Sequence, residues 1–376
     1  MPTILSARVL YDESGQIDFP EIRIEDGVVI AIEAGAASDA RGTLTAASFD
    51  IHVHGAVKQD LMSADAAGID AVGRFLAQRG VGFYLPTTVT GPIDRTLRAL
   101  ERLATAIEAG PAQAAATPIG IHLEGPFISH LKRGVHPPAN ILEPSVALFE
   151  RMQQAARGHI RLITIAPEMP HALELIAHAT GAGVRISLGH SNATAAETRA
   201  AIAAGATSAT HMFNAMRAID HREPGIAGTI LDSDDVYAEA ICDGVHLDPA
   251  IVRLWLKMKG EARAILVTDG ISATGMPDGI YQLGNFPVEV RDGACRTLDT
   301  GTLAGSALTM DTAIANVQRF TGISLAGATR LASRNPATML GLPELGRIGV
   351  GSTANFNLYD DAGKLSATIL RGQRVG

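Results

Sequence analysis

The sequence predicts an α/β fold: a (β/α)8 barrel of the TIM type, with a small β-sandwich domain formed from both chain termini. One observation predicts the barrel. Between residues 50 and 343, short apolar runs alternate with alanine-rich helical stretches. Strands that are apolar on both faces are typical of a parallel sheet covered by helices. So many repeats over roughly 290 residues suit a closed eight-stranded barrel.

A second observation predicts the sandwich. Residues 1–49 alternate polar and apolar side chains, as in EIRIEDGVVIAIEAG, and residues 344–376 return to this alternation. A period of two is the pattern of half-buried antiparallel strands. Neither segment has enough apolar surface to be stable alone. We therefore expect residues 1–49 and 344–376 to form one domain and residues 50–343 to form the barrel, with a β-hairpin inserted near residues 276–302.

Composition excludes several classes of function. The 376-residue chain has a formal net charge of −8, and it lacks a basic stripe, so we expect neither nucleic acid nor a membrane surface as a partner. No segment reads as a signal peptide or a transmembrane helix. Cys242 and Cys295 are too few for a disulfide framework, which favours a cytoplasmic location.

Potential metal ligands lie at the ends of the predicted strands. In SFDIHVHGA, Asp50, His52 and His54 share one strand face, because alternate residues of a strand point the same way. Burying such a face is costly unless something binds it; hydrogen bonds to neighbouring strands are the alternative. Four further candidates end later strands: Glu124, His190, His211 and Asp269. Barrel active sites form at the C-terminal ends of strands, and nitrogen and carboxylate ligands without thiolates favour a catalytic metal.

An ordered set of motifs then points to a family. HLEGPF, GHS, THMFNAM, REPGIAG, DGVHLD, LVTDG, GTLAGS and NPATMLGL follow the Asp-x-His-x-His segment in this order. Together they resemble the N-acetylglucosamine-6-phosphate deacetylases of the amidohydrolase superfamily, over nearly the whole chain. The resemblance implies a barrel with a small β-sandwich, a homodimer, and hydrolysis of the N-acetyl group of a sugar phosphate. The usual Pro-Gly before the first barrel strand is replaced by AASFD, which affects the turn into the barrel more than the chemistry.

The resemblance also implies the cofactor. Glu124, His190 and His211 correspond to the metal ligands, and His52 and His54 match members of the family that bind a second metal. In a two-metal version Glu124 would bridge the ions. We therefore expect one or two divalent transition metal ions per subunit, with zinc or iron suited to these ligands.

The remaining roles also come from the resemblance. Asp269 matches the catalytic acid/base, and it would approach the first-strand metal. His136 matches the residue that contacts the substrate amide carbonyl. The other implied substrate-binding residues are Val135, Asn214, Ala215, Arg222, His246, Leu303, Ala304 and Gly305. Two of these have a plainer alternative: Arg222 would pair with a surface carboxylate, and His246 would cap the helix that follows it. His122 shares the inward face of Glu124 but matches no ligand position, so we expect it either directly behind the metal ligands or in the core.

The chemistry of amide hydrolysis agrees with this assignment. A divalent metal lowers the pKa of bound water to about 7 and so supplies hydroxide as nucleophile. Asp269 would take the proton of that water and deliver it to the departing nitrogen, while His136 and the metal stabilise the oxyanion. No G-x-S-x-G segment occurs, and Cys242 is predicted inside a strand, so covalent catalysis is a poor alternative.

Other functions stay open. N-acetyl-D-glucosamine 6-phosphate is the favoured substrate, with N-acetylgalactosamine 6-phosphate as the alternative, because the sequence does not reveal which epimer is preferred. Cyclic-amide hydrolases and nucleobase deaminases on this barrel often use a carboxylated lysine on the fourth strand, but the fourth strand here, RLITIAPE, has none. A non-catalytic binding protein would be favoured only if a metal histidine or Asp269 were missing.

Overall fold

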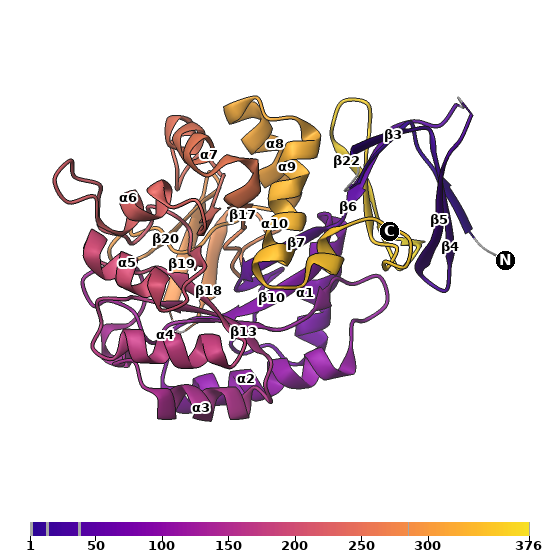
Figure 1. Cartoon of the computed structure of the whole chain (residues 1–376). Helices are drawn as coiled ribbons and strands as arrows, with labels where there is room; N and C mark the ends of the chain where they lie inside the picture. The colour runs from indigo at the N-terminus through magenta and orange to yellow at the C-terminus, as the bar shows by residue number, and fades with distance from the viewer. Residues whose placement is uncertain (1–2, 13–14, 37–38, 285, 376) are drawn as a thin grey trace.

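The computed structural model describes residues 3–12, 15–36, 39–284 and 286–375. Its centre is a barrel of parallel strands that follow one another in chain order (Figure 1). The strands are β7 (Ser48–Val53), β10 (Val81–Thr88), β12 (Ile121–Glu124), β13 (Ile160–Ile165), β14 (Arg185–Leu188), β15 (Ser208–Ala209), β16 (Tyr237–Ala240) and β17 (Ala264–Leu266). The short β11 (Thr117–Pro118) also pairs with β10. The (β/α)8 prediction is confirmed.

Backbone hydrogen bonds beyond the last strand close the barrel. The Asp269 N–H donates to the His52 carbonyl at 2.9 Å, and the His54 N–H donates to the Gly270 carbonyl at 2.7 Å. Inside the closed barrel the Asp50 carboxylate accepts a hydrogen bond from the Thr268 hydroxyl. This closure brings the histidines that end β7 beside the loop that carries Asp269.

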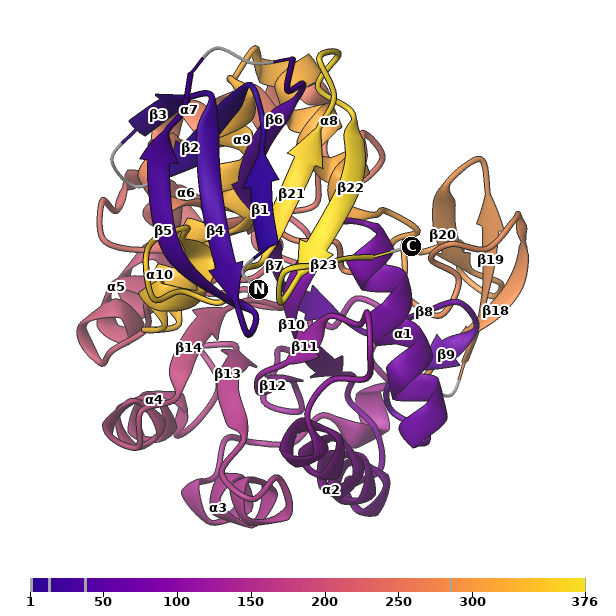
Figure 2. The same ribbon diagram turned by 90° about the vertical axis from the view of Figure 1, so that its right-hand side faces the viewer.

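Helices surround the barrel as a ring, most clearly where α2 to α5 follow one another in Figure 2. They are α1 (Ala66–Gln78), α2 (Ile93–Ala109), α3 (Val146–Ala155), α4 (Ala172–Gly181), α5 (Ala195–Ala203), α6 (Gly225–Asp232), α7 (Pro249–Arg263), α8 (Met310–Thr321), α9 (Leu325–Ala332) and α10 (Arg334–Met339), with 3-10 turns at Pro138–Asn140 and Pro343–Gly346. Local signals start several of them. Asp65 accepts the Gly68 N–H at the start of α1, and Thr194 and Glu197 form a capping box at the start of α5.

Two sheets built from both ends of the chain form the sandwich beside the barrel (Figure 2). One contains β1 (Thr3–Ser6), β4 (Pro20–Glu25) and β5 (Val28–Ala34). The other has the order β23 (Gln373–Arg374), β22 (Leu365–Leu370), β21 (Phe356–Tyr359), β6 (Thr43–Ala46), β2 (Val9–Asp12) and β3 (Gly15–Asp18). Leu10, Ile22, Leu44 and Phe356 are fully buried in the core of this sandwich. Strand β7 begins at Ser48; the domain boundaries after residues 49 and 343 stay predictions.

The inserted segment has one strand more than the expected hairpin. Strands β18 (Gly279–Leu283), β19 (Phe286–Arg291) and β20 (Ala294–Thr297) form an antiparallel sheet. The Asp292-Gly293 pair, with both φ angles positive, turns β19 into β20, as this dipeptide does in tight hairpins. The buried face of the sheet packs on the loops after β17. A small hairpin, β8 (Gly55–Ala56) and β9 (Gln59–Asp60), follows β7. Among the described residues, no helix is long and apolar enough to cross a bilayer.

Candidate metal centre and active site

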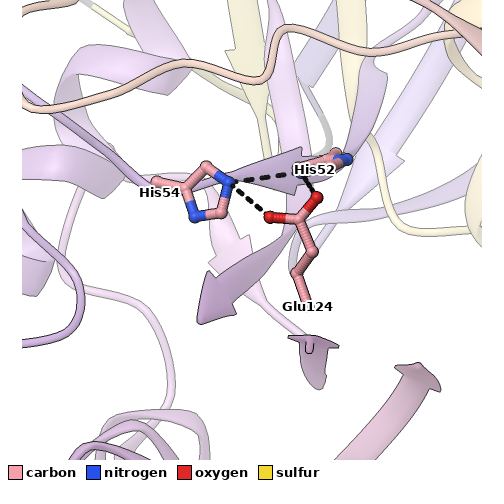
Figure 3. A group of neighbouring side chains, drawn as sticks. All are labelled: His52, His54 and Glu124. Atoms are coloured by element: carbon pink, nitrogen blue, oxygen red, sulfur yellow. Dashed lines mark hydrogen bonds and ion pairs between the residues drawn. The ribbon is translucent and has the colours of Figure 1, made fainter. Parts of the chain in front are cut away.

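Four histidines and a glutamate converge at the C-terminal mouth of the barrel. Their ligand atoms form two groups: His52, His54 and Glu124, and Glu124, His190 and His211. Figure 3 shows the first group, with both imidazoles turned toward the Glu124 carboxylate. Glu124 Oε1 lies 3.2 Å from Nε2 of both His190 and His211, and Oε2 lies 3.3 Å from His54 Nε2. Glu124 is therefore placed between the two groups, where a bridging ligand would lie.

The ring nitrogen that faces away from the centre fixes the tautomer of these histidines. His54 Nδ1 lies 3.2 Å from the Thr87 carbonyl, and His190 Nδ1 lies 3.1 Å from the Lys132 carbonyl. A carbonyl oxygen only accepts, so Nδ1 carries the proton in both rings and Nε2 is free to bind a cation. Metal-binding histidines usually have such an acceptor behind them. The donor set therefore fits a divalent transition metal.

The electrostatics of the cluster also favour a cation. Burial lowers the pKa of His54, but the carboxylates of Asp269 and Glu124 outweigh it and raise that pKa to about 9. The same balance of burial against Glu124 and Asp269 holds the pKa of His52 well above its usual value. Burial alone would raise the pKa of Glu124, but the surrounding imidazoles, His52 foremost, hold it well below its ordinary range. A site that stabilises protons this strongly also stabilises a metal ion, and the two compete.

Three site residues have an unfavourable backbone conformation. His190, His211 and Asp269 have φ angles of 47°, 27° and 51°. Positive φ is uncommon for residues other than glycine and costs about 1–3 kcal/mol in such sites. Each residue follows the end of its strand, where the chain turns sharply. The strain accompanies a geometry that directs the three side chains into the barrel mouth.

Asp269 lies beside the first-strand histidines. Its Oδ1 is 3.2 Å from His54 Nε2 and 3.5 Å from His52 Nε2. Burial would raise the pKa of this carboxyl, but His52 and His54 outweigh that effect and hold the pKa below its ordinary value. A carboxylate in this position is ready to accept a proton from a group held at the centre.

His136 faces the same centre with its proton on the inner nitrogen. The Thr90 backbone N–H donates to His136 Nδ1 at 3.3 Å, so Nδ1 is an acceptor and the neutral ring carries its proton on Nε2. That Nε2 lies 3.6 Å from Glu124 Oε2. Burial, and then the charge of His190, lower the pKa of His136 to about 4. His136 is thus a neutral donor. Only glycine fits at position 125, because a Cβ there would lie 2.0 Å from the hydroxyl of Thr90, the residue that contacts His136 Nδ1.

The cluster opens into a cavity of about 320 Å³. Among the predicted site residues, the cavity is lined by His54, Glu124, Val135, His136, His190, His211, Asn214, Ala215, His246, Asp269, Leu303 and Gly305. A larger cavity of about 440 Å³ lies between the sandwich and α9. It contains none of these residues, so the chemistry and not the size identifies the site.

Two predicted substrate residues do not reach this cavity. Ala304 is fully buried, packs in the core of the inserted sheet and donates its N–H to the Cys295 carbonyl. Arg222 lies exposed on the loop before α6, where its backbone N–H binds Asp220. The motifs that contain these residues are present, but a motif does not reveal which way its loop turns. Their substrate role stays a prediction.

His122, expected behind the ligands or in the core, meets both descriptions, since its ring centroid lies 4.6 Å from that of His52. His122 is fully buried, its Nδ1 donates to the Ile51 carbonyl, and its Nε2 lies 2.8 Å from the Thr164 hydroxyl. Both nitrogens are therefore occupied. Cys242 lies just after β16 and not inside a strand, which corrects the sequence interpretation. Burial raises the pKa of its thiol, so it remains a poor nucleophile.

Sequence reasoning missed three residues around the site. Lys132 lines the cavity. The available sequence signal was that Lys132 lies only four residues before His136, in the same predicted loop. Asp243 Oδ2 holds His246 Nδ1 at 2.7 Å. Glu239 is fully buried with Oε2 3.4 Å from His52 Nδ1. A lone acidic residue in the apolar run VYAEAI was the signal for Glu239, because carboxylates are rarely buried without a partner.

A model of the amidohydrolase family matches residues 43–375. With the barrel and its histidine-carboxylate centre, this match shows that the chain belongs to the amidohydrolase family.

Similar proteins narrow the family further. The chain is 38% identical to an N-acetylgalactosamine-6-phosphate deacetylase of Escherichia coli O157:H7 over 99% of both chains. It is 37% identical to an N-acetylglucosamine-6-phosphate deacetylase of Bacillus subtilis, covering 86% of this chain and 82% of the relative. A solved N-acetyl-D-glucosamine-6-phosphate deacetylase of Mycobacterium smegmatis, a mutant in complex with N-acetyl-D-glucosamine-6-phosphate, matches with 34% identity and a TM-score of 0.94, covering 100% and 99% of the two chains. Within the amidohydrolases, the chain is one of the N-acetylglucosamine-6-phosphate deacetylase group.

Proposed function

We propose that the protein hydrolyses the N-acetyl group of N-acetyl-D-glucosamine 6-phosphate to the amino-sugar 6-phosphate and acetate. The observation that carries this proposal is the arrangement around Glu124. Two metal-ligating groups share this carboxylate. Asp269 Oδ1 lies 3.2 Å from His54 Nε2, and His136 Nε2 lies 3.6 Å from Glu124 Oε2. These groups face a cavity of about 320 Å³, which is in the range of small-molecule sites.

The residues of the chain divide the chemistry of amide hydrolysis. Glu124, His190 and His211 would hold a divalent metal, and His52 and His54 would hold a second; when bound, the metal would supply an activated water and polarise the amide carbonyl. Asp269 accepts the proton of the attacking water and donates it to the departing amine nitrogen. The His136 Nε2–H donates a hydrogen bond to the carbonyl oxygen, where negative charge develops. No nucleophilic side chain is needed.

The phosphate of the substrate needs cations and hydrogen-bond donors in the wall of the cavity. Lys132 and His246 line this cavity, and Asp243 orients the His246 ring. Charge-assisted hydrogen bonds to phosphate are short and strong. We assign Lys132 and His246 to the phosphate, with Asn214 and the backbone amide of Ala215 beside them. The Asn214 N–H itself donates to the His211 carbonyl at 3.1 Å. Arg222 stays a predicted contributor from outside the cavity.

Three finer assignments complete the proposal. The ligand set suits zinc or iron. The protein acts as a homodimer, as the family resemblance implies, and light scattering of the purified protein tests this. Its location is the cytoplasm, which the two free buried cysteines, Cys242 and Cys295, support.

A substrate panel tests the function. Acetate release is measured for N-acetyl-D-glucosamine 6-phosphate, its galactosamine epimer, unphosphorylated N-acetylglucosamine and a cyclic amide. We expect the highest kcat/KM for the glucosamine 6-phosphate. A higher value for the epimer would change the substrate but not the chemistry. Turnover of the cyclic amide alone would contradict the proposal; the absence of a lysine from β13 already disfavours that reaction.

A further inference from the structure

Each ligand histidine except one has an acceptor behind its outer ring nitrogen. His54 and His190 use backbone carbonyls, and His52 Nδ1 lies 3.4 Å from Glu239 Oε2. His211 Nδ1 is buried and has no hydrogen-bond partner among the described residues. Because His211 Nε2 faces Glu124 and His190 at 3.2 and 3.1 Å, Nδ1 is the nitrogen left to donate.

Glu239 offers the complementary unpaired acceptor. Its side chain is fully buried on β16. Oε2 lies 3.4 Å from the His211 backbone nitrogen as well as from His52 Nδ1. Oε1 is buried and, within the described chain, has no partner. The carboxylate thus reaches a ligand of each metal group and keeps one oxygen free.

A purely structural role does not account for this carboxylate. Buried carboxylates are normally paired with a cationic side chain or satisfied by several hydrogen bonds. In the part of the chain that the structure describes, no lysine or arginine forms an ion pair with Glu239, and its ion-pair partner is His52. Its neighbours on the strand, Ala238 and Ala240, are small and fully buried. The charge is therefore best compensated by a cation bound through the histidines.

We propose that Glu239 is a positioning residue for both metal-ligating groups. Through Oε2 it holds the Nδ1–H of His52, and through Oε1 it receives the Nδ1–H of His211 by way of one water molecule, which would satisfy both atoms that have no partner among the described residues. Both rings then present Nε2 to the centre. This inference rests on the proposed metal-dependent function, and it adds one residue that couples the two groups.

Glu239→Gln tests the inference with little change of shape. The amide keeps one acceptor oxygen and replaces the other with a donor, so it cannot accept from both rings. We expect metal affinity, measured by chelator competition with the metal-stripped protein, to fall by about 10- to 100-fold. The visible absorption spectrum of the cobalt-substituted protein should change, and excess metal should restore part of the turnover.

Asp60→Asn is the matched control. Asp60 is also a buried carboxylate, but it accepts from the backbone N–H groups of Met62 and Gly284. Among the described residues its carboxylate forms no hydrogen bond or ion pair with a ligand histidine, and the charge of His54 acts on it only through space. We expect a lower melting temperature with unchanged metal affinity in this control. If Glu239→Gln behaves like the control, with wild-type affinity and cobalt spectrum, the positioning role is wrong. If the wild-type protein itself binds no metal, the proposed function fails instead, so the two failures are distinguishable.

Discussion

Asp269 and His136 share the proton chemistry of the site, and their surroundings set opposite roles. Asp269 is held as a carboxylate by the neighbouring imidazoles, because burial alone would raise its pKa but His52 and His54 lower it. His136 is kept neutral, since burial lowers its pKa to about 4. One group accepts a proton and the other donates a hydrogen bond at neutral pH. Such pairs of groups with divergent pKa values indicate acid/base assignments.

Asp269→Asn separates proton transfer from binding. The amide keeps the shape of the side chain but cannot accept and return a proton. We expect turnover to fall by about 10²- to 10⁴-fold, while substrate still binds and the metal at His190 and His211 remains. Acetate release at fixed times measures turnover, and elemental analysis measures the metal that remains bound. Near-normal turnover would remove Asp269 from the mechanism.

Lys132→Ala tests the phosphate end of the cavity. A charge-assisted hydrogen bond contributes about 1.5–3 kcal/mol, so we expect kcat/KM for the 6-phosphate to fall roughly 10- to 150-fold. The unphosphorylated sugar should hardly be affected. Arg222→Ala is measured in the same way; a selective loss there would show that Arg222 reaches the phosphate from outside the cavity. Equal losses on both substrates would mean that Lys132 only shapes its loop.

At the residue scale, the sequence predicts the metal-ligating residues but not the residues that orient them or line the cavity beside them. His52, His54, Glu124, His190 and His211 stand out because polar side chains at barrel strand ends have few structural explanations. The signals for Glu239 and Lys132 are weaker, since Glu239 is a single acid within a predicted strand and Lys132 is a lysine in a loop. Ala304 and Arg222 show the opposite limit, because side-chain direction in a loop depends on contacts that the sequence does not display.

At the scale of elements, the site forms because the carboxyl ends of the barrel strands meet at one mouth of the barrel. The barrel period of apolar runs predicts β10, β12, β13 and β14, and closure after β17 brings Asp269 to the His52 carbonyl. The short strand β15, Ser208–Ala209, has no propensity signal of its own and is defined by its neighbours. Strand β20 was missed because its segment, ACRT, has no run of large apolar residues, and its pairing with β19 defines it.

Lys259 on α7 caps the C-terminal end of α6, and replacing it tests how much this capping contributes to stability. Its buried ammonium donates to the carbonyls of Ile230, at 2.9 Å, and Ser233 at the C-terminal end of α6. Lys259→Met removes both of these hydrogen bonds, and the Ile230 carbonyl then keeps only the Ser233 N–H as a donor, so we expect the free energy of unfolding to fall by about 1–3 kcal/mol. Lys257→Met makes the same change on the exposed face and should stay within about 0.5 kcal/mol. Urea titrations compare them; equal losses would contradict the capping role.

At the scale of the whole molecule, the two ends of the chain complete one sandwich. The alternation of residues 20–25 predicts its buried and exposed faces correctly, as the burial of Ile22 and Ile24 shows. Which strands pair, including β6 with both β2 and β21, cannot be deduced from a period of two, because any strands with matching faces satisfy it. The preferred epimer likewise does not follow from the sequence, because it depends on the shape of the loops around the cavity.

Metal dependence is the central claim, and it links stability and activity. A metal that binds only the folded protein stabilises it by about 4 kcal/mol when its concentration is a thousand times Kd. Chelation should therefore lower the melting temperature and abolish turnover together.

The most direct measurement is acetate release from N-acetyl-D-glucosamine 6-phosphate as a function of bound metal, in protein stripped by a chelator and reloaded with zinc or iron(II) in steps. We expect turnover to rise in proportion to bound metal, reaching its maximum at one or two equivalents per subunit, and to be absent in stripped protein. Full turnover in protein that contains no transition metal by elemental analysis would contradict the account.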